Sequence, residues 1–494
     1  MNKSIFWGVF SGFCAYFVRL FGSVIQSAFV IRYLDPVNAG IWFLFLGIFT
    51  FISLCDFGLS PTLSRELGLA SYKRNRKYRE RLLYSTIRKL NRILSLIVFV
   101  VLVITLIVIE FNKSVDLNII IAFSLFSIAV VIRFLANPAL AFIYGYGYVS
   151  TQKWLLTIAS AINALLGAIA LYLGGGLIGI SAVYLFSFLL LCLFSSYYVS
   201  RHFKIKSNNK IQTVVIKRIF EPCIQWSLMT LGTVLIFQID AFILAIIVGV
   251  VEVTVFAVIK QLCSAIIGLS GIFNGASVPF ISSKKGASDH QGVYKLFIFN
   301  VKFATMLAIF MAVFILFNHV ELGHFWLGEK FSFNVTLLVV MCISTILEVH
   351  HVSCGQVTMA AGYVKFAKIA LIAGALNLIL SIVFAYLYGV VGVGVALLIT
   401  QLSTNNWYVV KKAIGFLKLS LKQYAMLVLQ LILYLIFNIL FNVLLVYWMP
   451  FMSDFWHLLV SGMMNLVFFC LFILTMADER QVVIKILKYY FVKH

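Results

Sequence analysis

The sequence has 494 residues, of which 63% are hydrophobic and 11% are charged, and its formal net charge is +22. A water-soluble domain needs far more polar surface than this composition supplies, so a soluble fold is excluded. The lysines and arginines collect in gaps between apolar runs, and no gap is long enough for a separate nucleic-acid-binding domain, so we expect no nucleic-acid partner.

Apolar runs recur from Ile5 to Met476, and each of them, at about 18 residues or more, is long enough to cross a hydrocarbon core about 30 Å thick. Because backbone amides find no water in that core, these runs are expected to be helices. We therefore predict an all-α polytopic membrane protein with about 14 transmembrane helices. The expected spans are 5–31, 39–61, 93–110, 118–143, 151–173, 177–199, 222–248, 253–281, 296–317, 333–360, 366–388, 391–411, 424–447 and 456–476.

Positive charge is distributed very unevenly between the two sides of the expected bundle. The gaps at 71–92 and 200–220 are strongly basic, whereas the opposite side holds only Arg32, Lys113 and Lys330 as cations. Basic loops stay in the cytoplasm, so we predict that both termini are cytoplasmic in a bacterial inner membrane.

An internal repeat is indicated at an offset near 215 residues, because Gly147-Tyr148-Val149 recurs as Gly362-Tyr363-Val364. A unit of six spans is even, so two copies would enter the membrane in the same direction. We expect two parallel six-helix lobes around a central cleft, plus two extra C-terminal helices. The expected parts are an N-terminal lobe over 1–202, a basic cytoplasmic linker over 203–220, a C-terminal lobe over 221–414, helices 13 and 14 over 415–478, and a cytoplasmic tail over 479–494.

Ionisable residues inside spans are costly and usually face a wet interior, so they are the candidate functional residues. Three cations are predicted to line the cleft and bind an anionic head group, because guanidinium and ammonium groups pair with phosphate oxygens: Arg19, Arg133 and Lys260. Snorkelling towards the surface is an alternative for Lys260, and Lys302 is expected to snorkel.

A second group is predicted to act in ion coupling or as a gate: Asp240, Glu348, His350 and His351. The repeat maps Arg133 onto Glu348, which would bring the two towards the cleft from opposite lobes. A purely structural role is the alternative for Asp240, and adjacent histidines point in different directions, so His350 and His351 cannot both face the cleft.

No feature indicates a metal site, a cofactor or an enzyme. The eight cysteines fall in or beside apolar runs without C-x-x-C spacing. The short external connections supply neither paired carboxylates on a scaffold nor a phosphate-binding glycine loop.

Three segments carry a resemblance to a known family: Arg32-Tyr33-Leu34-Asp35-Pro36-Val37-Asn38-Ala39-Gly40-Ile41-Trp42, Asp56-Phe57-Gly58-Leu59-Ser60-Pro61 and Phe325-Trp326-Leu327-Gly328. They resemble motifs of the multidrug/oligosaccharidyl-lipid/polysaccharide exporter superfamily, and within it the O-antigen type of lipid-linked oligosaccharide flippase. Asp35 departs from the family's usual glycine and Phe57 from its usual leucine.

The resemblance implies a transporter that flips an undecaprenyl-diphosphate-linked oligosaccharide, the O-antigen repeat unit, from the cytoplasmic to the periplasmic leaflet by alternating access. It implies an H⁺ or Na⁺ gradient as the driving force. The expected partners are the lipid-linked diphosphate oligosaccharide, membrane lipids and other envelope polysaccharide assembly proteins. A multidrug/cation antiporter of the same superfamily, a peptidoglycan lipid flippase and an integral-membrane enzyme remain alternatives.

Overall fold

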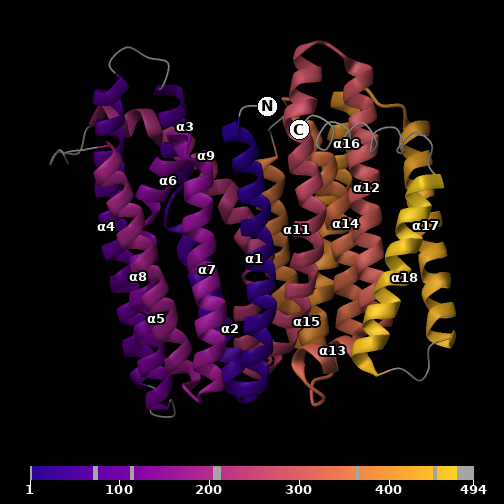
Figure 1. The fold of residues 1–494 in the computed structure, drawn as a ribbon, viewed down its shortest axis with the longest axis horizontal. Helices are drawn as coiled ribbons and strands as arrows, with labels where there is room; N and C mark the ends of the chain where they lie inside the picture. The colour runs from indigo at the N-terminus through magenta and orange to yellow at the C-terminus, as the bar shows by residue number, and fades with distance from the viewer. Residues whose placement is uncertain are drawn as a thin grey trace. The chain divides into compact units, whose positions relative to one another are not determined.

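A computed structural model describes residues 3–70, 76–111, 116–203, 213–362, 366–448 and 453–475, and every regular element in these ranges is a helix. The helices of each part of the chain run side by side (Figure 1). The chain divides into two compact units, Met1–Thr254 and Val255–His494. The boundary at residue 254 lies beyond the expected linker over 203–220, because the two helices that follow this linker pack on the N-terminal unit. The expected boundaries of the two six-helix lobes stay a prediction.

The N-terminal unit is built from α1 (Lys3–Tyr33), α2 (Pro36–Leu54), α3 (Leu59–Ala70), α4 (Arg76–Phe111), α5 (Leu117–Leu135), α6 (Asn137–Gly145), α7 (Val149–Tyr172), α8 (Gly176–Phe203), α9 (Thr213–Phe237), α10 (Asp240–Ile247) and the start of α11 (Val250–Gly286). The C-terminal unit contains the rest of α11 with α12 (His290–Phe317), α13 (His319–Leu327), α14 (Val335–Ala360), α15 (Ala367–Ser403), α16 (Asn405–Leu417), α17 (Leu421–Trp448) and α18 (Asp454–Thr475).

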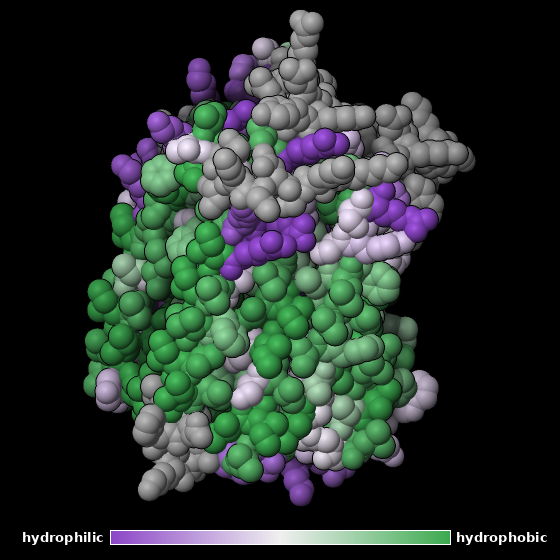
Figure 2. All heavy atoms as spheres, turned by 90° about the vertical axis from the view of Figure 1, so that its left-hand side faces the viewer, coloured by the Kyte–Doolittle hydropathy of each residue, from purple (hydrophilic) through white to green (hydrophobic). Residues whose placement is uncertain are grey.

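Twelve helical segments of the described ranges are long and apolar enough to cross a membrane. One of them, Ala367–Leu417, is broken at Gly389, where φ is 62° and ψ is −139°, so it forms two helices. With the shorter apolar helix Pro36–Ile52, these segments account for the fourteen expected spans. Figure 2 shows the corresponding surface on one face, a broad apolar band with hydrophilic residues gathered above it. The protein is an all-α polytopic membrane protein.

The expected span over 39–61 is wrong in one respect, because a turn divides it into α2 and α3. The carboxylate of Asp56 accepts hydrogen bonds from the amide and the hydroxyl of Ser60, both at 2.9 Å, and so caps the start of α3. Phe57 and Gly58 follow with φ of 44° and 68°. A Cβ atom on Gly58 would lie 2.7 Å from Cβ of Trp226, so glycine lets α9 approach the turn closely.

The fourth span is also broken, between α5 and α6. Pro138 has no amide hydrogen to donate to the carbonyl oxygen of Phe134, one turn earlier. The side chain of Asn91 on α4 donates to that oxygen instead, at 3.1 Å, and is buried. A backbone group freed inside the membrane is thereby satisfied by a neighbouring helix.

Aromatic side chains form the core of the N-terminal unit. Trp42 on α2 makes edge-on contacts with Phe126 on α5 and Tyr184 on α8, with ring centroids 5.6 and 5.1 Å apart. In the C-terminal unit, Tyr434 on α17 is fully buried, and its ring centroid lies 4.7 Å from that of Phe472 on α18. These large rings hold α2, α5 and α8, and separately α17 and α18, in fixed contact.

Backbone conformation repeats along the chain at the offset that the sequence indicates. Gly147 and Gly362 both have positive φ, 100° and 110°, at the ends of α6 and α14. Gly174 and Gly389, with φ of 79° and 62°, each separate two consecutive spans. This recurrence agrees with the internal repeat.

Candidate functional site

Two clusters of charged side chains inside the N-terminal unit contain the predicted arginines. One joins Arg19 on α1 to Lys153 on α7, and the other joins Arg133 to Asn137 and Asp56. The expected single cationic site is therefore divided, and the two clusters differ in net charge.

The first cluster depends on the close packing of α1 against α7. A Cβ atom on Gly22 would meet Cβ of Ala164 at 3.0 Å, so these small residues let the two helices approach. Arg19 is exposed and donates from Nε to the carbonyl oxygen of Ala15 at 3.3 Å, while Lys153 is half-buried. The two cations are near enough to repel each other.

Neither Arg19 nor Lys153 has a carboxylate within ion-pair distance among the described residues. Two positive charges on neighbouring helices inside apolar spans are unfavourable unless an anion compensates them. A diphosphate fits this requirement, because its oxygens accept several charge-assisted hydrogen bonds. We therefore define Arg19 and Lys153 as the candidate anion site.

The second cluster contains a cation and an acid. Arg133 on α5 donates from Nη1 to Oδ1 of Asn137 at 2.6 Å, and the side chain of Asn137 also hydrogen-bonds to Asp56. The Asp56 carboxylate is buried and attracts the guanidinium. Asp56 lies near enough to offset part of the charge of Arg133, although no direct ion pair joins the two among the described residues, and the predicted contact of Arg133 with substrate stays a prediction.

Two further predicted residues lie apart from these clusters. Asp240 is buried in the first turn of α10, where a carboxylate is favoured by the partial positive charge of the helix start. Lys260 on α11, in the C-terminal unit, is partly buried, and its Nζ lies 5.3 Å from the centroid of the Phe256 ring. This cation–π contact holds the ammonium beside its own helix.

The C-terminal unit brings Glu348 and His351 together, one turn apart on α14. His351 Nε2 lies 3.7 Å from Oε2 of Glu348, and Gln401 on α15 donates to the same oxygen at 2.8 Å. His351 Nδ1 faces two oxygen atoms, the carbonyl of Leu347 at 3.1 Å and Oδ1 of Asn406 at 2.8 Å.

Because both neighbours of His351 Nδ1 are acceptors, that nitrogen carries a hydrogen, and Nε2 is left to face the carboxylate. Glu348 and His351 are thus two buried polar groups that face each other inside the C-terminal unit, and their role in ion coupling stays a prediction. His350 points elsewhere, as adjacent helical residues must, and its Nε2 lies 3.2 Å from the hydroxyl of Tyr424 on α17.

Sequence reasoning missed three residues. Asp56 looked only like a motif position, and Lys153, four residues into its span, looked like a surface lysine. Lys302 was expected to snorkel, but its side chain is only 3% exposed on α12. Lys153 lies four residues after the repeated Gly147-Tyr148-Val149 motif, and Lys368 has the same place in the second copy, so the repeat marks the position although not its partner. Among the described residues, no group of three or more His, Cys, Asp or Glu side chains is placed to hold a metal ion.

The fold matches those of solved membrane transporters. It is similar to the lipid II flippase MurJ in an inward closed conformation, with 15% identity and a TM-score of 0.70, covering 96% of this chain and 100% of that one. An inward-facing multidrug resistance MATE transporter has a TM-score of 0.58 at 14% identity and covers 82% of this chain and 99% of its own. A transporter of the MOP superfamily from Pyrococcus furiosus, described as having a binding pocket of reverse polarity, has a TM-score of 0.57 at 15% identity, covering 84% and 96%.

Fold and composition thus define a helical membrane protein with the fold shared by the lipid II flippase and the multidrug transporters. The sequence model of the polysaccharide biosynthesis protein family matches residues 5–285, and the chain belongs to that family. No curated protein sequence matches this chain.

Proposed function

We propose that this protein flips a polyprenyl-diphosphate-linked oligosaccharide, of the O-antigen repeat-unit type, from the cytoplasmic to the periplasmic leaflet of the inner membrane by alternating access. The observation that carries this proposal is the Arg19–Lys153 pair, which presents two uncompensated cations within the spans of the N-terminal unit. Such a pair suits the diphosphate of a lipid-linked sugar, whose charge cannot cross hydrocarbon unaided.

The comparisons favour a lipid-linked cargo over a drug. The family is one of polysaccharide biosynthesis, and the MurJ structure covers 96% of this chain, whereas the multidrug transporter leaves more of it unmatched at 82%. A cationic site also repels the cationic drugs that an antiporter would bind.

We further propose that protons, rather than Na⁺, reset the transporter through Glu348 and His351. A sodium ion needs several oxygen ligands, and the imidazole occupies one side of the carboxylate. One proton held between two buried groups changes the charge of α14 by one unit when it leaves. That change is large enough to bias two conformations of a membrane protein.

Complementation of a bacterial strain that lacks its own O-antigen flippase tests the proposed cargo. The intact protein is expected to restore surface polysaccharide in a strain with a matching repeat unit. Failure in several donor strains together with resistance to cationic drugs would contradict the proposal in favour of an antiporter. Rescue of a strain depleted of its lipid II flippase, without rescue of surface polysaccharide, would assign the peptidoglycan precursor as cargo instead.

A further inference from the structure

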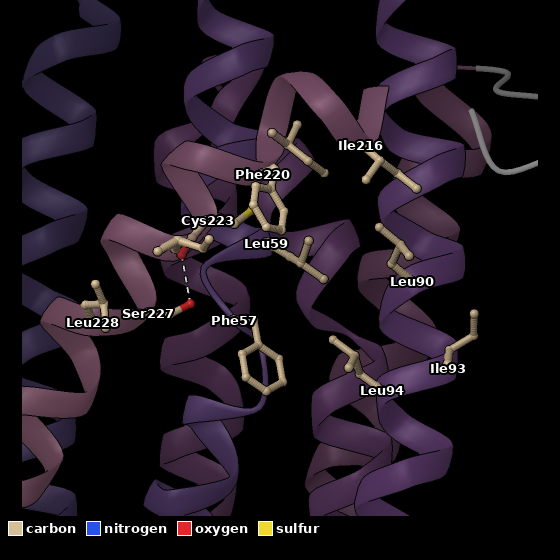
Figure 3. A pocket seen from close by; sticks show the side chains of 12 residues that line it. Phe57, Leu59, Leu90, Ile93, Leu94, Ile216, Phe220, Cys223, Ser227 and Leu228 are labelled. Carbon is tan, nitrogen blue, oxygen red and sulfur yellow. Dashed lines mark hydrogen bonds between the residues drawn. The ribbon is translucent and has the colours of Figure 1, made fainter. Parts of the chain in front are cut away.

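Two apolar cavities on the N-terminal unit share the same three walls: α4, the turn after α2, and the α9–α10 segment. The first has a volume of about 460 Å³ and is lined by Leu59, Leu90, Leu94, Phe220 and Leu228, among others (Figure 3). The second, of about 590 Å³, is lined by Phe51, Ile97, Val101, Thr105 and Phe242, among others. Almost all of the lining surface is apolar.

The two cavities follow one stripe along α4. Leu90 and Leu94 line the first, and Ile97, Val101 and Thr105, at helical spacing, line the second. At 1.5 Å per residue this stripe is about 22 Å long. One leaflet takes up about half of a hydrocarbon core about 30 Å thick, so the stripe is longer than one leaflet is deep.

Phe57 lines the first cavity, and Cys55, two residues earlier, lines the second, so the turn that holds Phe57 lies between the two sets of lining residues. Figure 3 shows its ring between α9 on one side and Leu94 on the other. A bulky residue with φ of 44° is in a sparsely populated conformation, and Phe57 is 52% exposed, so no tight packing requires it. Strain of this kind gathers at functional sites.

Cations border one end of these cavities. Lys89 lies one turn before Ile93 on α4, Arg92 directly precedes Ile93, and Lys217 lies one turn before Phe220 on α9. Two acids near these cations already have partners, because Glu221 accepts a hydrogen bond from Gln225 and Glu66 pairs with Arg218. Hydrophilic residues lie above the apolar band in Figure 2. Apolar cavities with basic residues beside them suit an amphiphile with an anionic head and a long apolar chain.

We infer that these two cavities form one lipid furrow that binds the polyprenyl chain of a polyprenyl diphosphate, with the diphosphate at the basic border formed by Lys89, Arg92 and Lys217. This inference rests on the proposed function for the identity of the lipid. The acyl chain of a phospholipid stays within one leaflet and would fill only the first cavity. The furrow is separate from the Arg19–Lys153 site and gives the cargo a docking position on the wall of the N-terminal unit.

Binding of undecaprenyl diphosphate to the purified full-length protein tests the furrow, measured by native mass spectrometry. Val101 lines the second cavity and is 56% exposed, whereas its neighbour Val100 is 48% exposed and does not line it. Val101→Trp is expected to weaken binding about tenfold or more by filling the furrow, and Val100→Trp to leave it unchanged. Ile93→Trp, with Leu96→Trp as its control, repeats the comparison at the first cavity.

Farnesyl diphosphate, whose chain is too short to reach the second cavity, is expected to lose affinity with Ile93→Trp but not with Val101→Trp. Equal binding of undecaprenyl diphosphate by both valine variants would overturn the furrow and leave the proposed function standing. Displacement of the probe by phosphatidylglycerol at similar concentration would also overturn it, in favour of a phospholipid site. An intact protein that binds no undecaprenyl diphosphate would contradict the furrow and the proposed function together.

Discussion

Gln401 on α15 donates a hydrogen bond from Nε2 to Oε2 of Glu348 on α14, at 2.8 Å, and both side chains are buried in the C-terminal unit. The same carboxylate oxygen faces His351 at 3.7 Å. Gln401 thus holds the carboxylate in place by a bond that needs no charge change, while the imidazole is the group that the proposed coupling pairs with it.

Removal of either group of the Glu348–His351 pair should uncouple transport from the proton gradient. With Glu348→Gln or His351→Gln, flipping of a lipid-linked oligosaccharide in proteoliposomes is expected to proceed at the same rate with and without a pH gradient. His350→Gln is the matched control, because His350 contacts Tyr424 rather than Glu348. If both variants still respond to the pH gradient, Glu348 and His351 do not carry the coupling proton.

Arg133 and Asp56 should behave as a structural pair. Arg133→Ala removes the hydrogen bond to Asn137 and the cation that attracts the buried Asp56 carboxylate, and loss of a hydrogen bond to a charged group costs about 1.5–3 kcal/mol. We expect a marked fall in membrane abundance and in unfolding temperature, measured by size-exclusion chromatography after heating. The double variant Asp56→Asn with Arg133→Gln removes both charges and should recover most of the loss. Normal stability of Arg133→Ala would contradict this assignment.

Much of the fold can be predicted from the sequence, because continuous apolar runs indicate the membrane-spanning helices and the charge asymmetry indicates their direction. The breaks between α2 and α3 and between α5 and α6 are harder to predict. The first break arises because Asp56 caps the start of α3 within an apolar run. The second, at Pro138, leaves the carbonyl oxygen of Phe134 without its helical donor, and the residue that donates to it, Asn91, lies 47 positions before the proline. The Glu348–His351 pair was accessible from spacing, since the residues lie one helical turn apart. Pairs between helices, such as Arg19 with Lys153, carry no signal in a single sequence.

Gly40, within the motif at the start of α2, should not tolerate a side chain. A Cβ atom there would lie 2.1 Å from the carbonyl oxygen of Val250, so Gly40→Ala is expected to cost about 1–3 kcal/mol through overpacking. Among the described residues, no heavy atom lies within 4 Å of such a Cβ on Gly12 of α1, and Gly12→Ala should be neutral or slightly stabilising. Equal unfolding temperatures for the two variants in detergent would argue against the close approach of Gly40 to the backbone of Val250.

The connection between α11 and α12 should make stability depend on pH. A hydrogen bond from Lys284 at 2.7 Å and one from the Gly292 amide at 2.8 Å lower the pKa of the Asp289 carboxyl below its ordinary value of 3.8. The ionised group therefore contributes stability above the ordinary pKa, and that contribution is lost as pH falls through the lowered value.

Asp289→Ala is accordingly expected to lower the unfolding temperature at neutral pH, with a difference from the intact protein that shrinks below about pH 4. Ser288→Ala, next to it in the same connection, is the control. A difference that stays constant down to the lowest pH at which the intact protein remains folded would show that the charge of Asp289 is not involved.

The most direct test of the account is the rate at which reconstituted protein moves an undecaprenyl-diphosphate-linked oligosaccharide between leaflets, followed by the access of a membrane-impermeant reagent to its sugar. Arg19→Ala and Lys153→Ala are each expected to slow flipping about tenfold or more, because a hydrogen bond to a charged group is worth about 1.5–3 kcal/mol. Arg201→Ala, on the exposed end of α8, should leave the rate unchanged. Full activity of both the Arg19 and Lys153 variants at normal abundance would contradict the anion site.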